Sequence, residues 1–215
     1  MVECAIMAGG PMESFPIHET FKGENLHPSL EWLNPPASWQ IDAARSCLLV
    51  ESSAETDFWQ RTHYGFRADS GRLLSAAVAT DGELQATVLA MPAHRYDQAG
   101  LMVRASADCW LKTSVEYEPS GPSQLGVVVT NNGFSDWSLQ DFTGTGTLSY
   151  CLRVRWEGGD FFVEHRTDEN GPWRLLRVAH LFRQPGSPLR CGLYACSPKG
   201  SGFHAEFSDL RIQAA

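Results

Sequence analysis

The architecture of this chain can be read from one stretch, Leu148–Arg166, whose sequence is LSYCLRVRWEGGDFFVEHR. Two runs of alternating apolar residues flank the pair Gly158-Gly159. Because glycine accepts positive φ angles, a two-residue glycine loop is typical of a tight β-hairpin. The stretch therefore predicts two antiparallel strands whose register can be written residue by residue.

In that register Glu157 lies opposite Asp160, and Arg153 lies opposite Glu164. One face of the hairpin is apolar, and we expect it in the core. Its residues are Leu152, Val154, Trp156, Phe161, Val163 and, at the edge, His165. The other face is charged, and the cross-strand pair of Arg153 and Glu164 contributes at most a few tenths of a kcal/mol there.

Period-two alternation recurs along the whole chain, whereas no stretch keeps a capped helical pattern. Turn sequences such as Asp81-Gly82 and Asn170-Gly171 separate the runs. The expected strands are 47–52, 58–64, 73–80, 83–91, 98–105, 110–118, 125–131, 148–157, 160–166, 173–180, 189–196 and 202–212. About a dozen short strands at this spacing predict an all-β antiparallel sandwich or barrel.

Length and composition agree with one soluble domain. The chain has 215 residues, of which 43% are hydrophobic and 20% are charged. A core of this size needs no disulfide, and no apolar run is long enough for a transmembrane helix. The formal net charge is −8, which argues against nucleic acid or an anionic membrane as a partner.

The cysteines are expected to be reduced. They are Cys4, Cys47, Cys109, Cys151, Cys191 and Cys196. The segment Met1–Ser14 lacks the basic and apolar regions of a secretory signal, and no C-x-x-C pair is present. We therefore expect six free thiols in a cytoplasmic protein, with the pair Cys191 and Cys196 the first to be checked.

Two neighbouring expected strands, 98–105 and 110–118, each carry a polar face. Their short connection makes them a hairpin, so the two polar faces should lie side by side. The residues brought together in this way are Gln98, Arg104, Lys112 and Glu116, with Trp110 at the edge. This group of side chains is the first candidate binding surface.

The expected strand 58–64 also has aromatic and polar residues on one side, namely Trp59, Arg61 and His63. Aromatic rings cover the apolar C–H faces of a sugar, and neighbouring Arg, Gln and Glu groups bind its hydroxyls or carboxylates. The alternative is that these residues belong to an ordinary solvated sheet face, where charged pairs are common. Both interpretations stay open at the level of sequence.

No catalytic or cofactor motif is complete. The serine of the segment Ser135–Ser138 has no partner histidine at an informative spacing, and no G-x-S-x-G elbow occurs. The seven histidines show no H-x-H or H-E-x-x-H spacing. We therefore expect no metal and no cofactor.

Several segments together carry a resemblance to a known family. They are WLNPPASW (Trp32–Trp39), TDFWQRTHYGF (Thr56–Phe66), YDQAGLMVR (Tyr96–Arg104), WLKTSVEY (Trp110–Tyr117), SDWS (Ser135–Ser138) and YACSPKGSGF (Tyr194–Phe203). They resemble the uncharacterised concanavalin A-like domain-of-unknown-function family that includes a fungal protein named for regulation of enolase.

The resemblance implies a concanavalin A-like jelly-roll sandwich of two antiparallel sheets, one of them concave. It runs from about Phe15 to Ile212, so we expect a single domain over residues 15–215 and a separate segment over residues 1–14. The family supplies no established reaction and hence no catalytic residue to transfer.

The leading functional hypothesis is a binding protein for a carbohydrate or other small polar ligand on the concave sheet. A glycan-active hydrolase or lyase that uses Glu116 is the first alternative. In a strand, Glu116 and Glu118 lie roughly 6.5–7 Å apart, more than the 5–5.5 Å of a retaining glycosidase, so a non-enzyme is favoured. A protein-interaction module, which would have a protein partner, is the second alternative.

Overall fold

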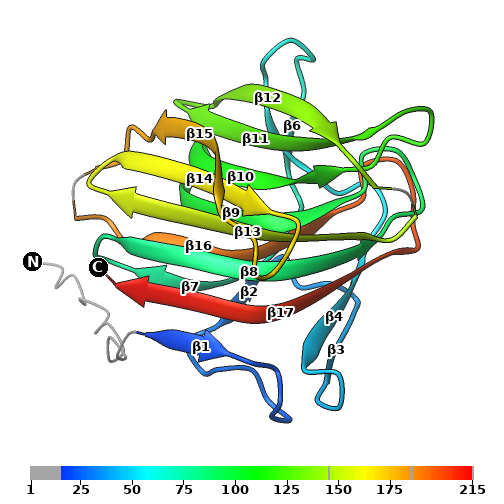
Figure 1. Cartoon of the computed structure of the whole chain (residues 1–215). Helices are drawn as coiled ribbons and strands as arrows, with labels where there is room; N and C mark the ends of the chain where they lie inside the picture. The colour runs from blue at the N-terminus through cyan, green and yellow to red at the C-terminus, as the bar shows by residue number, and fades with distance from the viewer. Residues whose placement is uncertain (1–15, 145, 185, 215) are drawn as a thin grey trace, which may run out of the picture.

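The computed structural model describes residues 16–144, 146–184 and 186–214, and these residues form strands and turns with no helix (Figure 1). Two large antiparallel sheets pack face to face, which confirms the expected all-β sandwich. The expected N-terminal segment 1–14 lies outside the described residues. No helix that could cross a membrane occurs in the described part of the chain.

The first sheet has eight strands. They are β1 (Ile17–Glu19), β3 (Ser38–Asp42), β4 (Cys47–Ser52), β8 (Gly82–Met91), β13 (Leu148–Glu157), β14 (Asp160–Arg166), β15 (Arg174–His180) and β17 (Phe203–Ala214). The order is β15-β14-β13-β8-β17-β4-β3, and β1 pairs with β17.

The second sheet has seven strands. They are β2 (Glu31–Leu33), β7 (Arg72–Val78), β9 (Gln98–Ser106), β10 (Cys109–Glu116), β11 (Ser123–Asn131), β12 (Phe134–Phe142) and β16 (Leu189–Cys196). Its order is β12-β11-β10-β9-β16-β7-β2. A small separate hairpin is formed by β5 (Phe58–Gln60) and β6 (Arg67–Asp69).

The hairpin of β13 and β14 has the register that its sequence predicts, from Glu157 opposite Asp160 to Arg153 opposite Glu164. Gly158 has a φ of +60°, as the tight turn requires. The predicted apolar face is buried between the sheets, and Arg153 Nε donates a hydrogen bond to Glu164 Oε2 at 2.8 Å.

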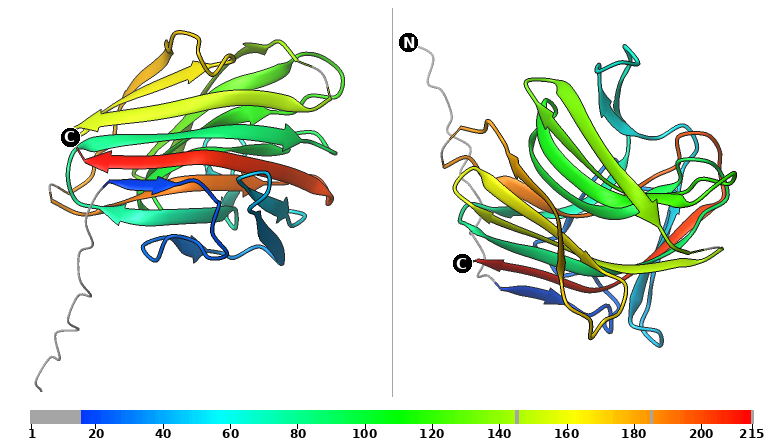
Figure 2. Two further views of the ribbon diagram at one scale, coloured as in Figure 1. Left: turned by 60° about the horizontal axis from the view of Figure 1, so that its bottom comes forward. Right: turned by 45° about the horizontal axis from the view of Figure 1, so that its top comes forward.

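The apolar residues form two clusters. The larger fills the space between the two sheets. The smaller, which we name the outer cluster, lies on the opposite face of the seven-stranded sheet. Its residues are Phe58, Trp59, Leu73, Met102, Trp110, Val128, Tyr194 and Cys196. Hairpin β5–β6, drawn in cyan in Figure 2, covers this outer face.

The structure differs from the expected strands at two kinds of position. The strand expected over residues 58–64 ends at Gln60, because Arg61 and His63 have positive φ angles of 55° and 62° and the chain turns there. Five strands were not expected, and they are β1, β2, β3, β6 and β12. The first, second and fourth have only three residues each, and β12 is mostly exposed.

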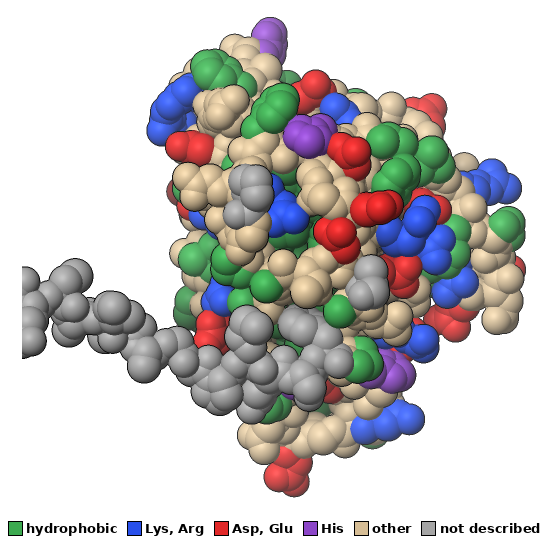
Figure 3. All heavy atoms as spheres, turned by 90° about the vertical axis from the view of Figure 1, so that its left-hand side faces the viewer, with side chains coloured by type: hydrophobic (Ala, Val, Ile, Leu, Met, Phe, Trp, Pro, Cys, Tyr) green, Lys and Arg blue, Asp and Glu red, His purple; other side chains and the backbone are tan. Residues whose placement is uncertain are grey.

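Charge is mixed over the surface that Figure 3 shows. Among the coloured residues of this face, acidic and basic side chains are interspersed, and the basic ones form no continuous patch. The mixed charge of this face agrees with the expectation from the net charge of −8 that the chain does not bind a phosphate backbone.

Five of the cysteines are described, and all five are buried free thiols. Cys4 lies outside the described residues. Cys191 belongs to the core between the sheets, whereas Cys196 belongs to the outer cluster, so the two side chains lie on opposite faces of β16. Alternate faces of one strand do not bring two sulfur atoms into bonding geometry.

A thiol titration tests the redox state directly. Protein denatured under anaerobic conditions should react at six thiols per chain, because the five described cysteines are buried free thiols and we expect Cys4 to be reduced as well. Ellman's reagent measures the number. A count of four would show that one pair had been oxidised in the native protein.

Candidate functional site

Strands β9 and β10 place four polar side chains on the outer face of the seven-stranded sheet. Their register pairs Gln98 with Glu116 and Met102 with Lys112, and it pairs Arg104 with Trp110. The alternate residues of both strands belong to the core between the sheets. The polar faces therefore lie side by side, as the alternation of the sequence predicts.

Hairpin β5–β6 is fixed over this face by apolar and polar contacts. The ring of Phe58 meets the rings of Trp110 and Tyr194 edge-on, each with a centroid separation of 6.3 Å. The backbone N–H of Gln60 donates a hydrogen bond to Ser135 Oγ at 2.9 Å. These contacts set the height of the hairpin above the sheet.

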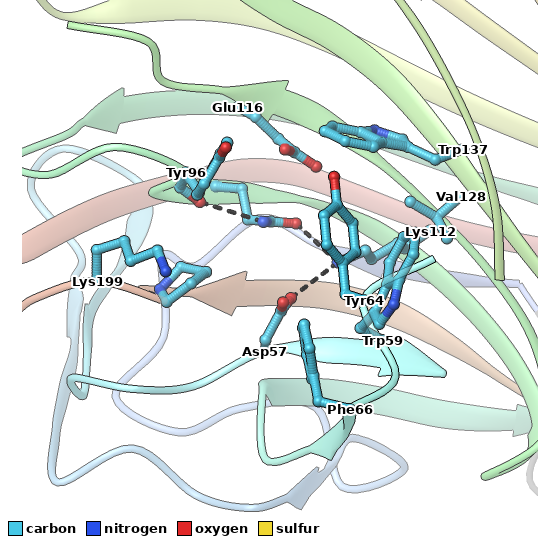
Figure 4. Close-up of a pocket in the computed structure, with 12 residues that line it drawn as sticks. Asp57, Trp59, Tyr64, Phe66, Tyr96, Lys112, Glu116, Val128, Trp137 and Lys199 are labelled. Atoms are coloured by element: carbon cyan, nitrogen blue, oxygen red, sulfur yellow. Dashed lines mark hydrogen bonds and ion pairs between the residues drawn. The ribbon is translucent and has the colours of Figure 1, made fainter. Parts of the chain in front are cut away.

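A cavity of about 220 Å³ lies between the hairpin and the sheet, and Figure 4 shows its lining. The walls come from the hairpin, from strands β9 to β12, and from the loops before β9 and after β16. The lining residues are Asp57, Trp59, Tyr64, Phe66, Tyr96, Gln98, Lys112, Glu116, Val128, Trp137, Pro198 and Lys199.

Lys112 is buried in this cavity with its charge satisfied. Its Nζ lies 3.1 Å from Asp57 Oδ1 and donates a hydrogen bond to Gln98 Oε1 at 3.0 Å. Gln98 is held in turn by the hydroxyl of Tyr194, which donates to the same oxygen at 3.0 Å. Burial alone would lower the pKa of Lys112, but the charge and hydrogen bond of Asp57 act together with Cys196 and Glu116 to raise the pKa above its ordinary value.

Glu116 differs from Lys112, because its charged group has no such partner among the described residues. Only 7% of the residue is exposed, and among the described residues no group donates a hydrogen bond to its carboxyl, whose oxygens reach the cavity. Burial raises its pKa from 4.5 to about 7, the charge of Asp57 adds to the effect, and Lys112 partly opposes it. The carboxyl points into the cavity, toward the hydroxyl end of Tyr64 (Figure 4).

Aromatic rings form one side of the cavity. Trp59 meets Trp137 edge-on at 6.2 Å and Tyr64 at 5.5 Å between ring centroids. The indole N–H of Trp59 donates to the carbonyl oxygen of Thr62 at 3.2 Å, which holds the ring in place. Tyr64 is 54% exposed, so the cavity opens to solvent beside it.

Four of the eight residues proposed from sequence line this cavity, namely Trp59, Gln98, Lys112 and Glu116. The other four are Arg61, His63, Arg104 and Trp110.

Two of these four lie beyond the end of β5, where the chain turns. Arg61 stacks on the ring of Phe134 at 5.0 Å, and His63 meets the ring of Tyr64. The other two lie beneath the hairpin. Trp110 is fully buried, with its indole N–H donating to the carbonyl oxygen of Ala107, and Arg104 binds Asp69. All four side chains are therefore engaged with the protein itself.

Eight lining residues were not among the eight proposed site residues, although Tyr96 has the residue type that a lyase base requires. They are Asp57, Tyr64, Phe66, Tyr96, Val128, Trp137, Pro198 and Lys199. Trp137 belongs to the SDWS segment, which carries part of the family resemblance but no pattern that points to a binding role. Asp57 and Tyr64 come with the hairpin, and no local pattern shows that this hairpin folds over the sheet.

Arg104 is expected to stabilise the hairpin rather than to bind a ligand. Its two terminal nitrogens bind the two carboxyl oxygens of Asp69 at 2.7 and 2.8 Å. Because Asp69 is partly exposed, we expect a coupling energy of about 1 kcal/mol between the two residues. A double-mutant cycle with Arg104→Ala and Asp69→Ala, measured by urea unfolding, gives the value. Coupling near zero would show that the ion pair does not hold the hairpin.

The carboxylate pair considered for hydrolysis is not formed. Strand β10 ends at Glu116, and Glu118 instead pairs with Arg95 at 2.7 Å and does not line the cavity. The second carboxyl in the cavity is Asp57, which is bound to Lys112. Within residues 16–144, 146–184 and 186–214, no group of three His, Cys, Asp or Glu side chains suits a metal ion.

Known proteins similar to this chain come from yeast and from bacteria. The chain is 34% identical over 183 residues to "Regulation of enolase protein 1" of Saccharomyces cerevisiae, covering 85% of this chain and 88% of that protein. A crystal structure of a functionally unknown protein from Saccharomyces cerevisiae has a TM-score of 0.79 and 33% identity, and the match covers 87% of this chain and 97% of that one.

Xylan beta-1,4-xylosidase from Bacillus halodurans C-125 has a TM-score of 0.73 at 14% identity, and the match covers 96% of this chain but 41% of that one. At this identity the likeness shows the fold alone. The family model described as "Protein of unknown function (DUF1349)" matches residues 32–215. The chain therefore belongs to this family.

Proposed function

We propose that the chain binds a carbohydrate or a sugar-like small molecule in the cavity beneath hairpin β5–β6. The observation that carries this proposal is the composition of the cavity wall. Indole rings of Trp59 and Trp137 lie on one side, and the polar groups of Gln98, Lys112 and Glu116 lie on the floor.

This combination fits the two kinds of surface on a sugar. The C–H faces of a pyranose pack on indole rings, while its hydroxyls need donors and acceptors close by. A volume of about 220 Å³ has room for a single sugar unit. Further units of a longer glycan would extend past the exposed ring of Tyr64 into solvent.

A glycan-active enzyme is the second candidate, and one observation favours it. A carboxyl with a pKa of about 7, such as that of Glu116, is suited to act as a general acid or base. However, the partner carboxyl of Asp57 is bound to Lys112 at 3.1 Å and is not free for a second role. We therefore place binding ahead of catalysis.

We also propose that the protein works in the cytoplasm. The five described cysteines are free thiols, and proteins in oxidising compartments tend to convert such thiols to disulfides. The likeness to the xylosidase supports the carbohydrate proposal only at the level of fold, because its printed name describes that enzyme and not this chain.

A glycan array run beside a reducing-sugar assay on the same panel tests the proposal. We expect binding to at least one glycan class without release of reducing ends. Trp59→Ala should weaken that binding by about 2 kcal/mol, as loss of a buried aromatic contact does. Trp39→Ala, at an exposed tryptophan on β3, is the matched control and should leave it unchanged.

Two results would contradict the proposal. Release of reducing ends that Glu116→Gln abolishes would establish the enzyme instead. Absence of binding to every glycan of the panel would remove the carbohydrate function.

A further inference from the structure

We propose that the ligand of this cavity carries a positively charged nitrogen, which binds between the carboxylate of Glu116 and the aromatic rings beside it. This inference rests on the proposed function, because it places the ligand in the same cavity. It adds that the ligand is a cation. An amino sugar is the member of that class that also satisfies the carbohydrate proposal.

The first step is the charge balance of the cavity. The ammonium group of Lys112 and the carboxylate of Asp57 lie 3.1 Å apart and neutralise each other. Gln98 accepts a second hydrogen bond from the ammonium group at 3.0 Å with its amide oxygen. The positive charge of Lys112 is therefore already paired with a carboxylate, which weakens its attraction for an anionic ligand.

Second, the pairing of Lys112 with Asp57 leaves Glu116 as the carboxyl of the cavity that has no ion-pair partner among the described residues. Glu116 is 7% exposed, points into the cavity, and accepts no hydrogen bond within the described residues. The carboxyl oxygens reach the open cavity, and a carboxylate in such a poorly solvated place is stabilised by a positive charge beside it, so the site favours a ligand that supplies one. In the absence of a ligand, a proton neutralises the Glu116 carboxyl. A bound cation would replace that proton.

The third step is the wall around this carboxyl. The rings of Trp59, Tyr64, Phe66, Tyr96 and Trp137 all line the same cavity. The face of an aromatic ring is electronegative, and several rings around a carboxylate form a cage that attracts ammonium groups. An anion would instead meet the carboxyls of both Glu116 and Asp57.

The titratable groups that face Glu116 come from several elements. In the cavity they are Lys112 on β10, Asp57 before β5, Tyr64 in the β5–β6 loop, Tyr96 before β9 and Lys199 after β16. A neighbouring hollow that Glu116 also lines adds Tyr117 and the ion pair of Glu118 with Arg95. Within the neutral range the charges of Lys112 and Asp57 stay balanced, and the side chain of Lys199 is exposed to solvent. Ligand binding between pH 6 and pH 8 should therefore follow the ionisation of Glu116.

Tetramethylammonium is a suitable first probe, because its charge does not change with pH, and tert-butanol is its neutral control. Isothermal titration should show binding of the cation and not of the alcohol. Affinity should rise about tenfold from pH 6 to pH 8, since a carboxyl with a pKa of about 7 goes from about one-tenth to nine-tenths ionised. At pH 6, binding should release protons to the buffer.

Two variants locate the effect. Glu116→Gln should weaken cation binding at pH 8 at least about tenfold and remove the pH dependence. Glu118→Gln is the matched control, because this carboxyl does not line the cavity and is paired with Arg95 in the adjoining hollow that Glu116 also borders. Its affinity and pH profile should equal those of the unchanged protein.

Glucosamine and glucose at pH 7 separate this inference from the proposed function. Preference for glucosamine that Glu116→Gln abolishes supports both. Equal binding of the two sugars would overturn the inference and leave carbohydrate binding intact. Binding of tetramethylammonium but of neither sugar would support the cation site and remove the carbohydrate function, and binding of none of the probes would overturn both.

Discussion

Phe58→Ala is expected to lower the free energy of unfolding by about 3–5 kcal/mol and to abolish ligand binding together with it. Phe58 is fully buried in the outer cluster, where its ring contacts Trp110 and Tyr194. Removing the ring leaves a cavity under hairpin β5–β6. The hairpin carries Asp57 and Trp59 to the site, so its displacement opens the binding cavity.

Urea unfolding gives the stability, and a ligand titration below the unfolding transition gives the affinity. Phe182→Ala is the matched control, since this phenylalanine is 66% exposed, and its removal should change stability by less than about 0.5 kcal/mol. A Phe58→Ala protein that lost stability yet bound its ligand with unchanged affinity would show that the hairpin does not form the site.

Glu116→Gln should remove a loss of stability that the unchanged protein undergoes as the pH rises from about 4.5 to about 7. In the folded state burial raises the pKa of Glu116 from 4.5 to about 7, so between these values the folded protein holds a proton that the unfolded chain has lost. Stability therefore falls as pH rises through this window. Glutamine has nearly the shape of the protonated carboxyl but does not ionise, so the variant does not lose stability in this way.

The advantage of Glu116→Gln over the unchanged protein should grow by roughly 2–3 kcal/mol between pH 5 and pH 8. Unfolding in urea at a series of pH values measures it, and groups common to both proteins cancel in the difference. Glu118→Gln should show no such trend, because Glu118 lies in the loop after β10, where it is paired with Arg95. A pH-independent difference for Glu116→Gln would show that this carboxyl is ionised throughout and well solvated.

Much of the fold follows from alternation and turns, because both act over a few residues. The Gly158-Gly159 turn fixes the register of β13 and β14, and parity fixes which side chains of β9 and β10 share a face. The position of Gln98 beside Glu116 could therefore be predicted from the sequence. Strand β12 could not, since most of its residues are exposed and its place depends on pairing with β11.

The candidate site could be predicted only in part, because it is formed by packing between distant segments. Asp57 reaches Lys112 across 55 positions of sequence, and the contact of Trp137 with Trp59 joins segments that lie still farther apart in the chain. Arg104 lies on the same face of the sheet as the site residues, but Asp69 of the covering hairpin forms an ion pair with it. Alternation shows which face a side chain takes and not which distant segment covers that face.

The most direct test of the account is to locate ligand binding on the protein itself. The chain has seven tryptophans, so 5-fluorotryptophan labelling gives seven fluorine signals that single substitutions assign. When a glycan found on the array, or glucosamine, is added, the signals of Trp59 and Trp137 should shift together in one saturable transition. The signals of Trp39 and Trp156, which lie away from the cavity, should stay in place. A saturable shift of those two, with Trp59 and Trp137 unchanged, would contradict the site beneath hairpin β5–β6.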